Sequence, residues 1–229
     1  MEDNSAKICD LIVEKGELKQ QIYNNTLESM QLFKECARDF EEYYKDNFSI
    51  KHERVSVHYT DKNQFEFKLR FAGDILIFLM HSNIFEFPRD HEVMKTPYIK
   101  EDRKRSYCGM IQIFNFLSDS FKYNRINDVG YMIGRIFINC DKHYYVEGKR
   151  ELAQVLNNFN SKELDKTAIT EIVHSAIQYT VNFDLLVPEY TNLMEVSVND
   201  ITQVEDQIMI LKTAKRLGFK FEPDVSMKK

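Results

Sequence analysis

The feature that most constrains this chain is a heptad-like apolar pattern over residues 4–46. Residues that are apolar, or that a helical seam tolerates, recur at alternating steps of three and four from Ile8 to Ile22. Two steps of four follow, to Met30, and the alternation of three and four then resumes to Tyr44. The positions are Ile8, Leu11, Lys15, Leu18, Ile22, Thr26, Met30, Phe33, Ala37, Phe40 and Tyr44. A seam of this kind with one stutter predicts a long amphipathic helix. We therefore expect residues 1–47 to form an N-terminal helical arm.

A single helix of this length would be longer than the compact body that a chain of this size forms. About 43 residues at 1.5 Å each make a helix ~64 Å long, whereas a compact chain of this size has a radius of gyration of about 17 Å. Either the helix breaks, at Gly16 or at Asn24-Asn25, and its two halves cover a sheet, or it extends beyond its own domain. The second alternative predicts a homodimer or another protein partner, bound through residues 4–46.

The pattern then changes from helical spacing to the alternation of β-strands. Residues 55–59 and 65–71 alternate apolar with polar side chains around a turn at 61–63, which predicts an antiparallel hairpin. Residues 75–80 are continuously apolar and predict a strand that is covered on both faces. Further strands are expected at 84–87, 107–117, 130–139 and 143–147, although the apolar segment 107–117 would also suit a buried helix.

The remainder, residues 148–229, shows helical patterns again. A short helix is expected near 152–159 and a longer one over 164–180, with Asn160 or Ser161 as its N-cap. A last helix is expected from Asn199 or Asp200 to Gly218. The fold class is therefore α+β, with an N-terminal arm at 1–47, an antiparallel, meander-like sheet of five to seven strands at 48–147, and a helical region at 148–229 in the same domain or a small subdomain.

Composition and charge narrow the class of protein. The chain has 31 basic and 36 acidic residues, a net charge of −5, which disfavours nucleic acid as a partner without excluding it. The four cysteines form no CxxC pair and suit a reducing compartment. There is no secretory pattern at the N-terminus and no apolar run of membrane-spanning length. We expect a cytoplasmic protein that is not membrane-bound.

One short segment resembles a catalytic motif. Glu147 and Lys149 flank a glycine after a predicted strand, and Asp128 lies upstream. This resembles the Asp…Glu-x-Lys layout of metal-dependent nucleases of the restriction-endonuclease type. The resemblance implies that the two carboxylates hold Mg²⁺ and that the lysine polarises the attacking water or the phosphate. Glu147 and Lys149 are thus the catalytic candidates of an alternative enzyme that acts on nucleic acid or nucleotides.

Hairpin geometry opposes this alternative. A turn at 140–142 places Glu147 opposite Arg135, and Asp128 then lies roughly 23 Å away at ~3.3 Å per residue. Two ligands of one magnesium ion cannot be so far apart. We therefore expect no metal and no cofactor.

A polar segment with two prolines, 88–106, interrupts the predicted sheet and ends in a basic cluster. Arg103, Lys104 and Arg105 are candidates for binding a phosphate or an acidic partner, although an ordinary solvated loop is the alternative. Asp141 and His143 lie on a predicted tight turn, where a surface role is expected.

These observations predict a non-enzymatic interaction protein that self-associates through its N-terminal helix. The alternatives are the metal-dependent enzyme described above and a small-ligand sensor. The sensor would need a partly polar cavity between the sheet and the helices, under the segment 88–106.

Overall fold

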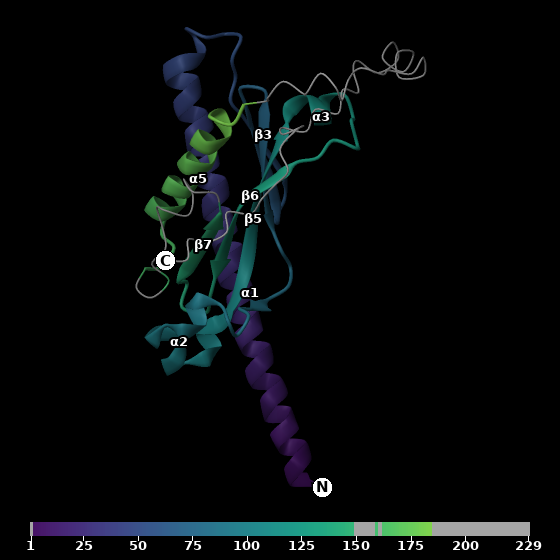
Figure 1. Cartoon of the computed structure of the whole chain (residues 1–229), viewed down its shortest axis with the longest axis vertical. Coiled ribbons are helices and arrows are strands. Elements are labelled where there is room, and N and C mark those ends of the chain that lie inside the picture. Colours follow the sequence, from purple (N-terminus) through teal and green to yellow (C-terminus); the bar gives the residue numbers. More distant parts are fainter. Residues whose placement is uncertain (1, 149–158, 160–161, 185–229) are drawn as a thin grey trace, which may run out of the picture.

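The computed structural model describes residues 2–148, 159 and 162–184 of the chain. Its first element, α1, is a single unbroken helix from Glu2 to Tyr44. One π-helical turn, η1 (Lys45–Ser49), follows it. The predicted helical arm is confirmed, and neither proposed break occurs, since Gly16 and Asn24-Asn25 both lie within α1. Figure 1 shows α1 running along the sheet and projecting well past its end at the N-terminal side.

The sheet has seven strands, all paired antiparallel. They are β1 (His58–Asn63), β2 (Glu66–Phe71), β3 (Asp74–Met80), β4 (Phe85–Glu86), β5 (Tyr107–Leu117), β6 (Tyr131–Ile138) and β7 (Tyr144–Gly148). Their order is β1-β2-β3-β5-β6-β7, and β4 pairs with the beginning of β5. The α+β class and the meander-like antiparallel sheet are therefore confirmed, and the segment 107–117 is a strand rather than a helix.

The first hairpin differs in register from the prediction. β1 begins at His58, so that Val55 and Val57 precede the strand, and it continues through the expected turn to Asn63. The turn lies at residues 64–65, where the Asn63 side-chain oxygen accepts a hydrogen bond from the Phe65 amide at 2.8 Å. This local bond lets the short polar side chain end the strand at Asn63, past the start of the turn that the alternation indicated.

One face of the sheet packs against α1 and against α5 (Lys166–Val181) and forms the main core. The rings of Phe33 on α1, Phe78 on β3 and Phe67 on β2 pack in series, with centroids 5.7 and 4.5 Å apart. α5 carries the apolar face predicted for 164–180, but its N-cap is Asp165, which accepts a hydrogen bond from the Ala168 amide at 2.7 Å. The expected caps at 160 and 161 lie outside the described residues.

α1 approaches the sheet closely at Gly109 of β5. A Cβ atom on this glycine would lie 2.0 Å from the hydroxyl oxygen of Thr26 and 2.9 Å from its Cβ. Thr26 is fully buried, and its hydroxyl donates to the Ile22 carbonyl at 2.7 Å. α1 therefore lies directly on the backbone of β5 at this point.

The polar segment 88–106 is folded into three short helical turns on the opposite face of the sheet. They are η2 (Glu92–Lys95), α2 (Pro97–Glu101) and η3 (Arg103–Ser106). They cover a second, smaller apolar cluster, which consists of Phe87, Val93, Ile99, Cys108, Met110, Phe137 and Phe159. A further short helix, α3 (Ser118–Lys122), follows β5.

Two of the predicted helices, near 152–159 and at 199–218, lie outside the described residues, with Phe159 as the exception. Within the described part of the chain, no helix is at once long enough and apolar enough to cross a membrane.

Candidate interaction surface

The projecting turns of α1 expose a row of large apolar side chains. Ile8, Leu11 and Ile12 are 50%, 64% and 65% exposed, and Val13 is 56% exposed. Ile8, Leu11 and Ile12 follow the three-and-four spacing of one helical face, whereas Val13 lies about 200° around the axis from Leu11. We call the first three residues, together with Asn4 and Lys15, the arm stripe.

The arm stripe continues the face of α1 that packs on the sheet. The next positions along the same seam are Leu18, Ile22 and Thr26, all buried against the body. The transition occurs at Lys15, whose ammonium lies 3.2 Å from the centroid of the Tyr107 ring of β5. The sequence pattern is therefore one seam, of which the sheet covers only the part from Leu18 onward.

The base of the arm is fixed to the body by charge. Lys104 of η3 lies 2.6 Å from the carboxylate of Glu14, and this contact lowers the pKa of Glu14 through the hydrogen bond and the charge of the lysine. Both side chains are about half exposed. A groove of about 450 Å³ is lined by Gly16, Lys19, Gln20 and Tyr23 of α1 and by the segment 82–85.

The basic cluster at the end of the segment 88–106 is occupied by intramolecular contacts. Lys104 pairs with Glu14, as described above. Arg105 pairs with Asp141 at 3.0 Å and with Glu101 at 3.1 Å, and its guanidinium lies over the ring of Tyr98. These contacts give Lys104 and Arg105 a role in holding η3 in place, and phosphate binding by Arg103, Lys104 and Arg105 stays a prediction.

Asp141 and His143 are held in the β6–β7 turn rather than presented as a free pair. The carboxylate of Asp141 accepts the hydroxyl of Tyr98 at 2.7 Å, and burial together with this bond raises the pKa of Tyr98. The ring of His143 stacks on Tyr98, and its Nδ1 lies 3.0 Å from the Phe159 carbonyl. From the opposite side, Asn25 of α1 donates to the Cys140 carbonyl at 2.9 Å.

The residues of the nuclease-like motif hold separate partners. Glu147 lies opposite Arg135 in the β6–β7 register, as the hairpin argument predicted, and accepts hydrogen bonds from its guanidinium. Asp128 accepts from Ser120 at 2.6 Å and pairs with Arg125 at 3.0 Å. Lys149 lies outside the described residues. Across the described ranges, no group of three or more His, Cys, Asp and Glu side chains is arranged to hold a metal ion.

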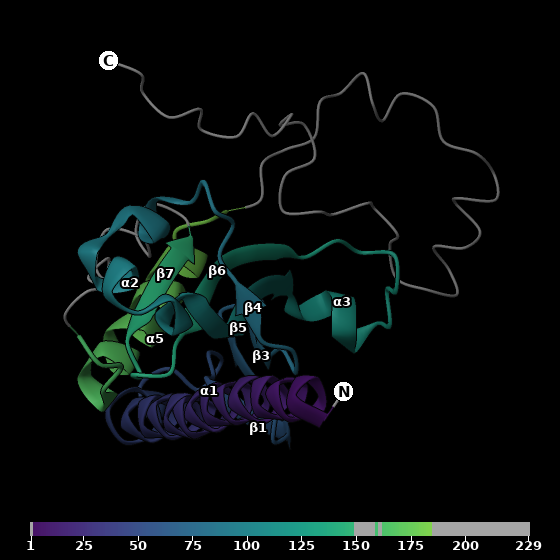
Figure 2. The ribbon, with the colours of Figure 1, turned by 90° about the horizontal axis from the view of Figure 1, so that it is seen from below.

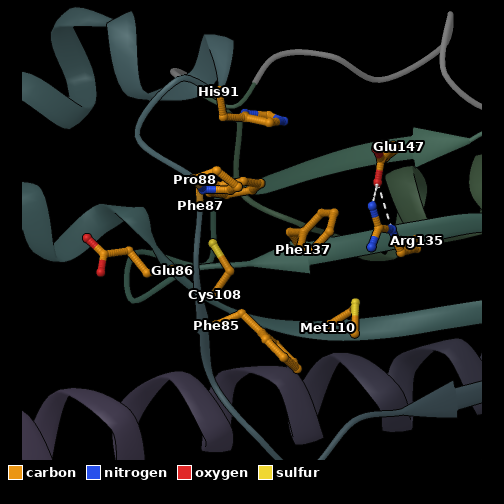
Figure 3. A pocket seen from close by; sticks show the side chains of 10 residues that line it. All are labelled: Phe85, Glu86, Phe87, Pro88, His91, Cys108, Met110, Arg135, Phe137 and Glu147. Carbon is orange, nitrogen blue, oxygen red and sulfur yellow. Dashed lines mark hydrogen bonds and ion pairs between the residues drawn. The ribbon is translucent and has the colours of Figure 1, made fainter.

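A pocket of about 400 Å³ lies on the face of the sheet away from α1, beneath the start of the segment 88–106. It is lined by Phe85, Glu86, Phe87, Pro88, His91, Cys108, Met110, Arg135, Phe137 and Glu147. Figure 3 shows the Arg135–Glu147 pair at one end of the pocket, Phe137 between this pair and the Phe87 side, and Glu86 pointing away. The pocket is thus mainly apolar with one charged end.

Of the residues that line the pocket, only Glu147 was a candidate from the sequence, and Arg135 was named as the residue opposite it. A signal was available on β5 and β6, where Met110 and Phe137 are apolar although they lie on the face opposite the main core. Apolar side chains on both faces of a strand indicate that something covers each face. Here the segment 85–91 covers the second face, but a sequence without an alignment does not show which segment does so.

These elements define an α+β protein with a seven-stranded antiparallel sheet and a projecting N-terminal helix. Comparison of the chain with protein-family models, with curated proteins and with solved structures found no match in any of the three.

Proposed function

We propose that this protein is a non-enzymatic interaction protein that self-associates through the projecting turns of α1. The observation that supports this proposal is the arm stripe. Ile8, Leu11 and Ile12 are at least half exposed on a helix that extends past its own sheet. A row of apolar side chains at helical spacing, left in water at the end of a folded body, is the usual form of a helix that packs on another chain.

Sedimentation velocity over a range of protein concentrations tests the proposal. The wild-type protein is expected to shift from monomer to dimer as its concentration rises. Leu11→Glu places a charge within the stripe and is expected to keep the protein monomeric. Val13→Glu is the matched control, because it makes the same kind of change two residues away on the opposite side of the helix. Circular dichroism checks that both variants stay folded.

Two results would contradict self-association through the arm. One is a wild-type protein that sediments as a monomer throughout the concentration range. The other is a dimer that Leu11→Glu and Val13→Glu weaken equally, since this would place the contact elsewhere on the molecule.

The pocket under the segment 85–91 supports a second candidate function, the binding of a small, mainly apolar molecule. Its volume of about 400 Å³ lies in the range of ligand sites, which are typically apolar with a few polar groups. The Arg135–Glu147 pair would provide the polar contacts. This pocket differs in position from the cavity expected between sheet and helices, because it lies on the other face of the sheet.

An uncharged fluorescent probe, N-phenyl-1-naphthylamine, tests this second candidate. We expect it to bind the wild-type protein and to bind Phe85→Ala several-fold more weakly, because Phe85 forms part of the pocket wall and is itself 37% exposed. Phe121→Ala is the control, since Phe121 is a similarly exposed ring on α3, outside the pocket. Equal binding by both variants would exclude this pocket as the site of the probe.

A further inference from the structure

The direction in which the arm stripe faces restricts how a second helix can pack on it. The stripe lies on the same side of α1 as the sheet, since Lys15 contacts Tyr107 of β5 and the seam continues through Leu18 and Ile22 into the core. Figure 2, seen from the end where α1 projects, places β3, β5 and β6 on one side of α1. A second helix that packs on the arm stripe can run parallel or antiparallel to α1. In one of these two orientations its continuation points directly at the sheet.

A parallel partner helix would collide with this body. If it followed the stripe in the same direction as α1, its own continuation past Lys15 would enter the space that β5 and η3 occupy. There is no gap between α1 and β5 to receive it, because Gly109 and Thr26 are already in direct contact. Packed helices need 8–10 Å between their axes. The sheet thus excludes a parallel pair of α1 helices.

We infer that a second copy of this chain binds the arm stripe in the antiparallel direction, with Asn4–Lys15 of each chain side by side. In this arrangement the body of each chain begins next to Asn4 of the other arm, so that the overlap Asn4–Lys15 ends where the sheet begins. The contact is the same on both chains, as a two-fold symmetric dimer requires. This inference rests on the proposed self-association and adds its partner, direction and register.

The register follows from placing the apolar residues against each other. When Ile8 lies opposite Leu11 of the second copy, Asn4 lies opposite Lys15 of the second copy. Ile8 and Leu11 then form two symmetric central layers, and Ile12 lies at their edge, level with Lys7 of the second copy. The flanking positions then bring Lys7 next to Glu14 of the second copy, and symmetry repeats this pair. Opposite charges at these positions stabilise the pairing, while Glu14 can keep its contact with Lys104 at the base of the arm.

The size of the overlap predicts a weak dimer. Asn4–Lys15 comprises about a dozen residues per chain, whereas a standard stable interface uses about 20–30 residues a side. We therefore expect the dimer to form at about micromolar concentrations rather than nanomolar ones.

Cysteine cross-linking of the full-length protein tests the direction and the register. All variants carry Cys9→Ser, because Cys9 is an exposed native thiol on the arm. Asn4→Cys and Lys15→Cys are made separately and treated with a short bismaleimide, alone and as a mixture. In the antiparallel register, residue 4 of one chain lies next to residue 15 of the other, whereas the two copies of residue 4 are about 16 Å apart along the axis.

The expected result is a covalent dimer that forms mainly in the mixture. Efficient cross-linking of Asn4→Cys by itself would indicate parallel arms and overturn the inference, although self-association would stand. A sedimentation dimer in which neither the single variants nor the mixture are linked would overturn the inference in the same way. A monomer in sedimentation together with no cross-linking would overturn both the inference and the proposed function. The Cys9→Ser protein alone gives the background from Cys140, which is partly exposed.

Discussion

Two buried asparagines, one on β5 and one directly after β6, have opposite hydrogen-bond environments. Asn115 on β5 is 1% exposed, and neither atom of its amide group has a hydrogen-bond partner among the described residues. Asn139, at the end of β6, is fully buried, and its amide donates to the Tyr98 hydroxyl and the Arg105 carbonyl while it accepts from the amides of Asp141 and His143. A buried polar group without a partner destabilises a fold by about 1–3 kcal/mol.

The same substitution should therefore have opposite effects at the two positions. Asn115→Leu, which keeps the side-chain size, is expected to raise the free energy of unfolding by about 1 kcal/mol. Asn139→Leu is expected to lower it by about 3 kcal/mol or more, because it leaves four partly buried groups of Tyr98, Arg105, Asp141 and His143 without this partner. Urea denaturation of both variants measures the two values. A destabilised Asn115→Leu protein would show that the amide has a structural role.

The carboxyl group of Glu41 is expected to make the stability of the fold depend on pH. Burial opposes its ionisation, but hydrogen bonds from Lys45, the Tyr59 amide and His58 outweigh this effect and hold the pKa of Glu41 below its ordinary value of 4.5. Because the carboxyl loses its proton more easily in the folded state, its contribution to stability is present above the unfolded-state pKa and is lost as the pH falls through the folded-state pKa.

Glu41→Gln is accordingly expected to lower the unfolding midpoint in urea at pH 7, and the difference from the wild-type protein should shrink as the pH falls below the ordinary value of 4.5. Asp39→Asn is a suitable control, because Asp39 is an exposed carboxylate on the same helix, paired with Lys166. A difference between wild type and Glu41→Gln that stays constant from pH 7 to pH 3 would contradict this role of the carboxylate.

At the scale of elements, the contact between α1 and β5 depends on the absence of a side chain at Gly109. Gly109→Ala would place its Cβ 2.0 Å from the Thr26 hydroxyl oxygen, and overpacking of this kind destabilises by about 1–3 kcal/mol. Thr26→Ala removes that oxygen. The cost of Gly109→Ala is therefore expected to be smaller in a Thr26→Ala background, and a double-mutant cycle by urea denaturation measures this coupling. Additive costs would show that the helix does not press on the strand here.

The elements were largely predictable because their signals are local. Alternation and apolar runs identified the strands, and the seam identified α1 over nearly its whole length. The segment 88–106 was not predicted as three helical turns, because each is too short to show a period. The N-cap at Asp165 was also missed, since several polar residues precede α5 and only the observed bond from the Ala168 amide distinguishes among them.

The candidate surface was predictable only in part. The seam indicated that α1 buries one face, but whether a sheet or another chain covers that face depends on where the sheet ends. This boundary is set by contacts distant in sequence, such as Lys15 with Tyr107 and Gly109 with Thr26. The pocket lies beneath the segment 88–106, where a cavity was expected, but on the other face of the sheet from α1 and α5. That face was not predicted, because the strand order brings β4 and the segment after it to the outer face of β6.

At the scale of the whole molecule, self-association through the arm should make thermal stability depend on concentration. A dimer that forms only from folded chains shifts the folding equilibrium by mass action, so that its melting temperature rises with protein concentration. The arm adds no core of its own, since residues 4–13 are exposed in the single chain. A substitution in the arm stripe should therefore remove the concentration dependence without lowering the melting temperature of the dilute protein.

Differential scanning fluorimetry over a wide range of concentrations measures this dependence. The wild-type protein and Val13→Glu are expected to melt at higher temperatures as their concentrations rise, whereas Leu11→Glu should melt at one temperature, equal to that of the dilute wild type. If Leu11→Glu melted lower than the dilute wild type, Leu11 would be stabilising its own chain, and the exposed seam would belong to the fold rather than to an interface. The comparison thus separates the role of the seam within the chain, from Leu18 onward, from the role between chains that we propose for the residues before it.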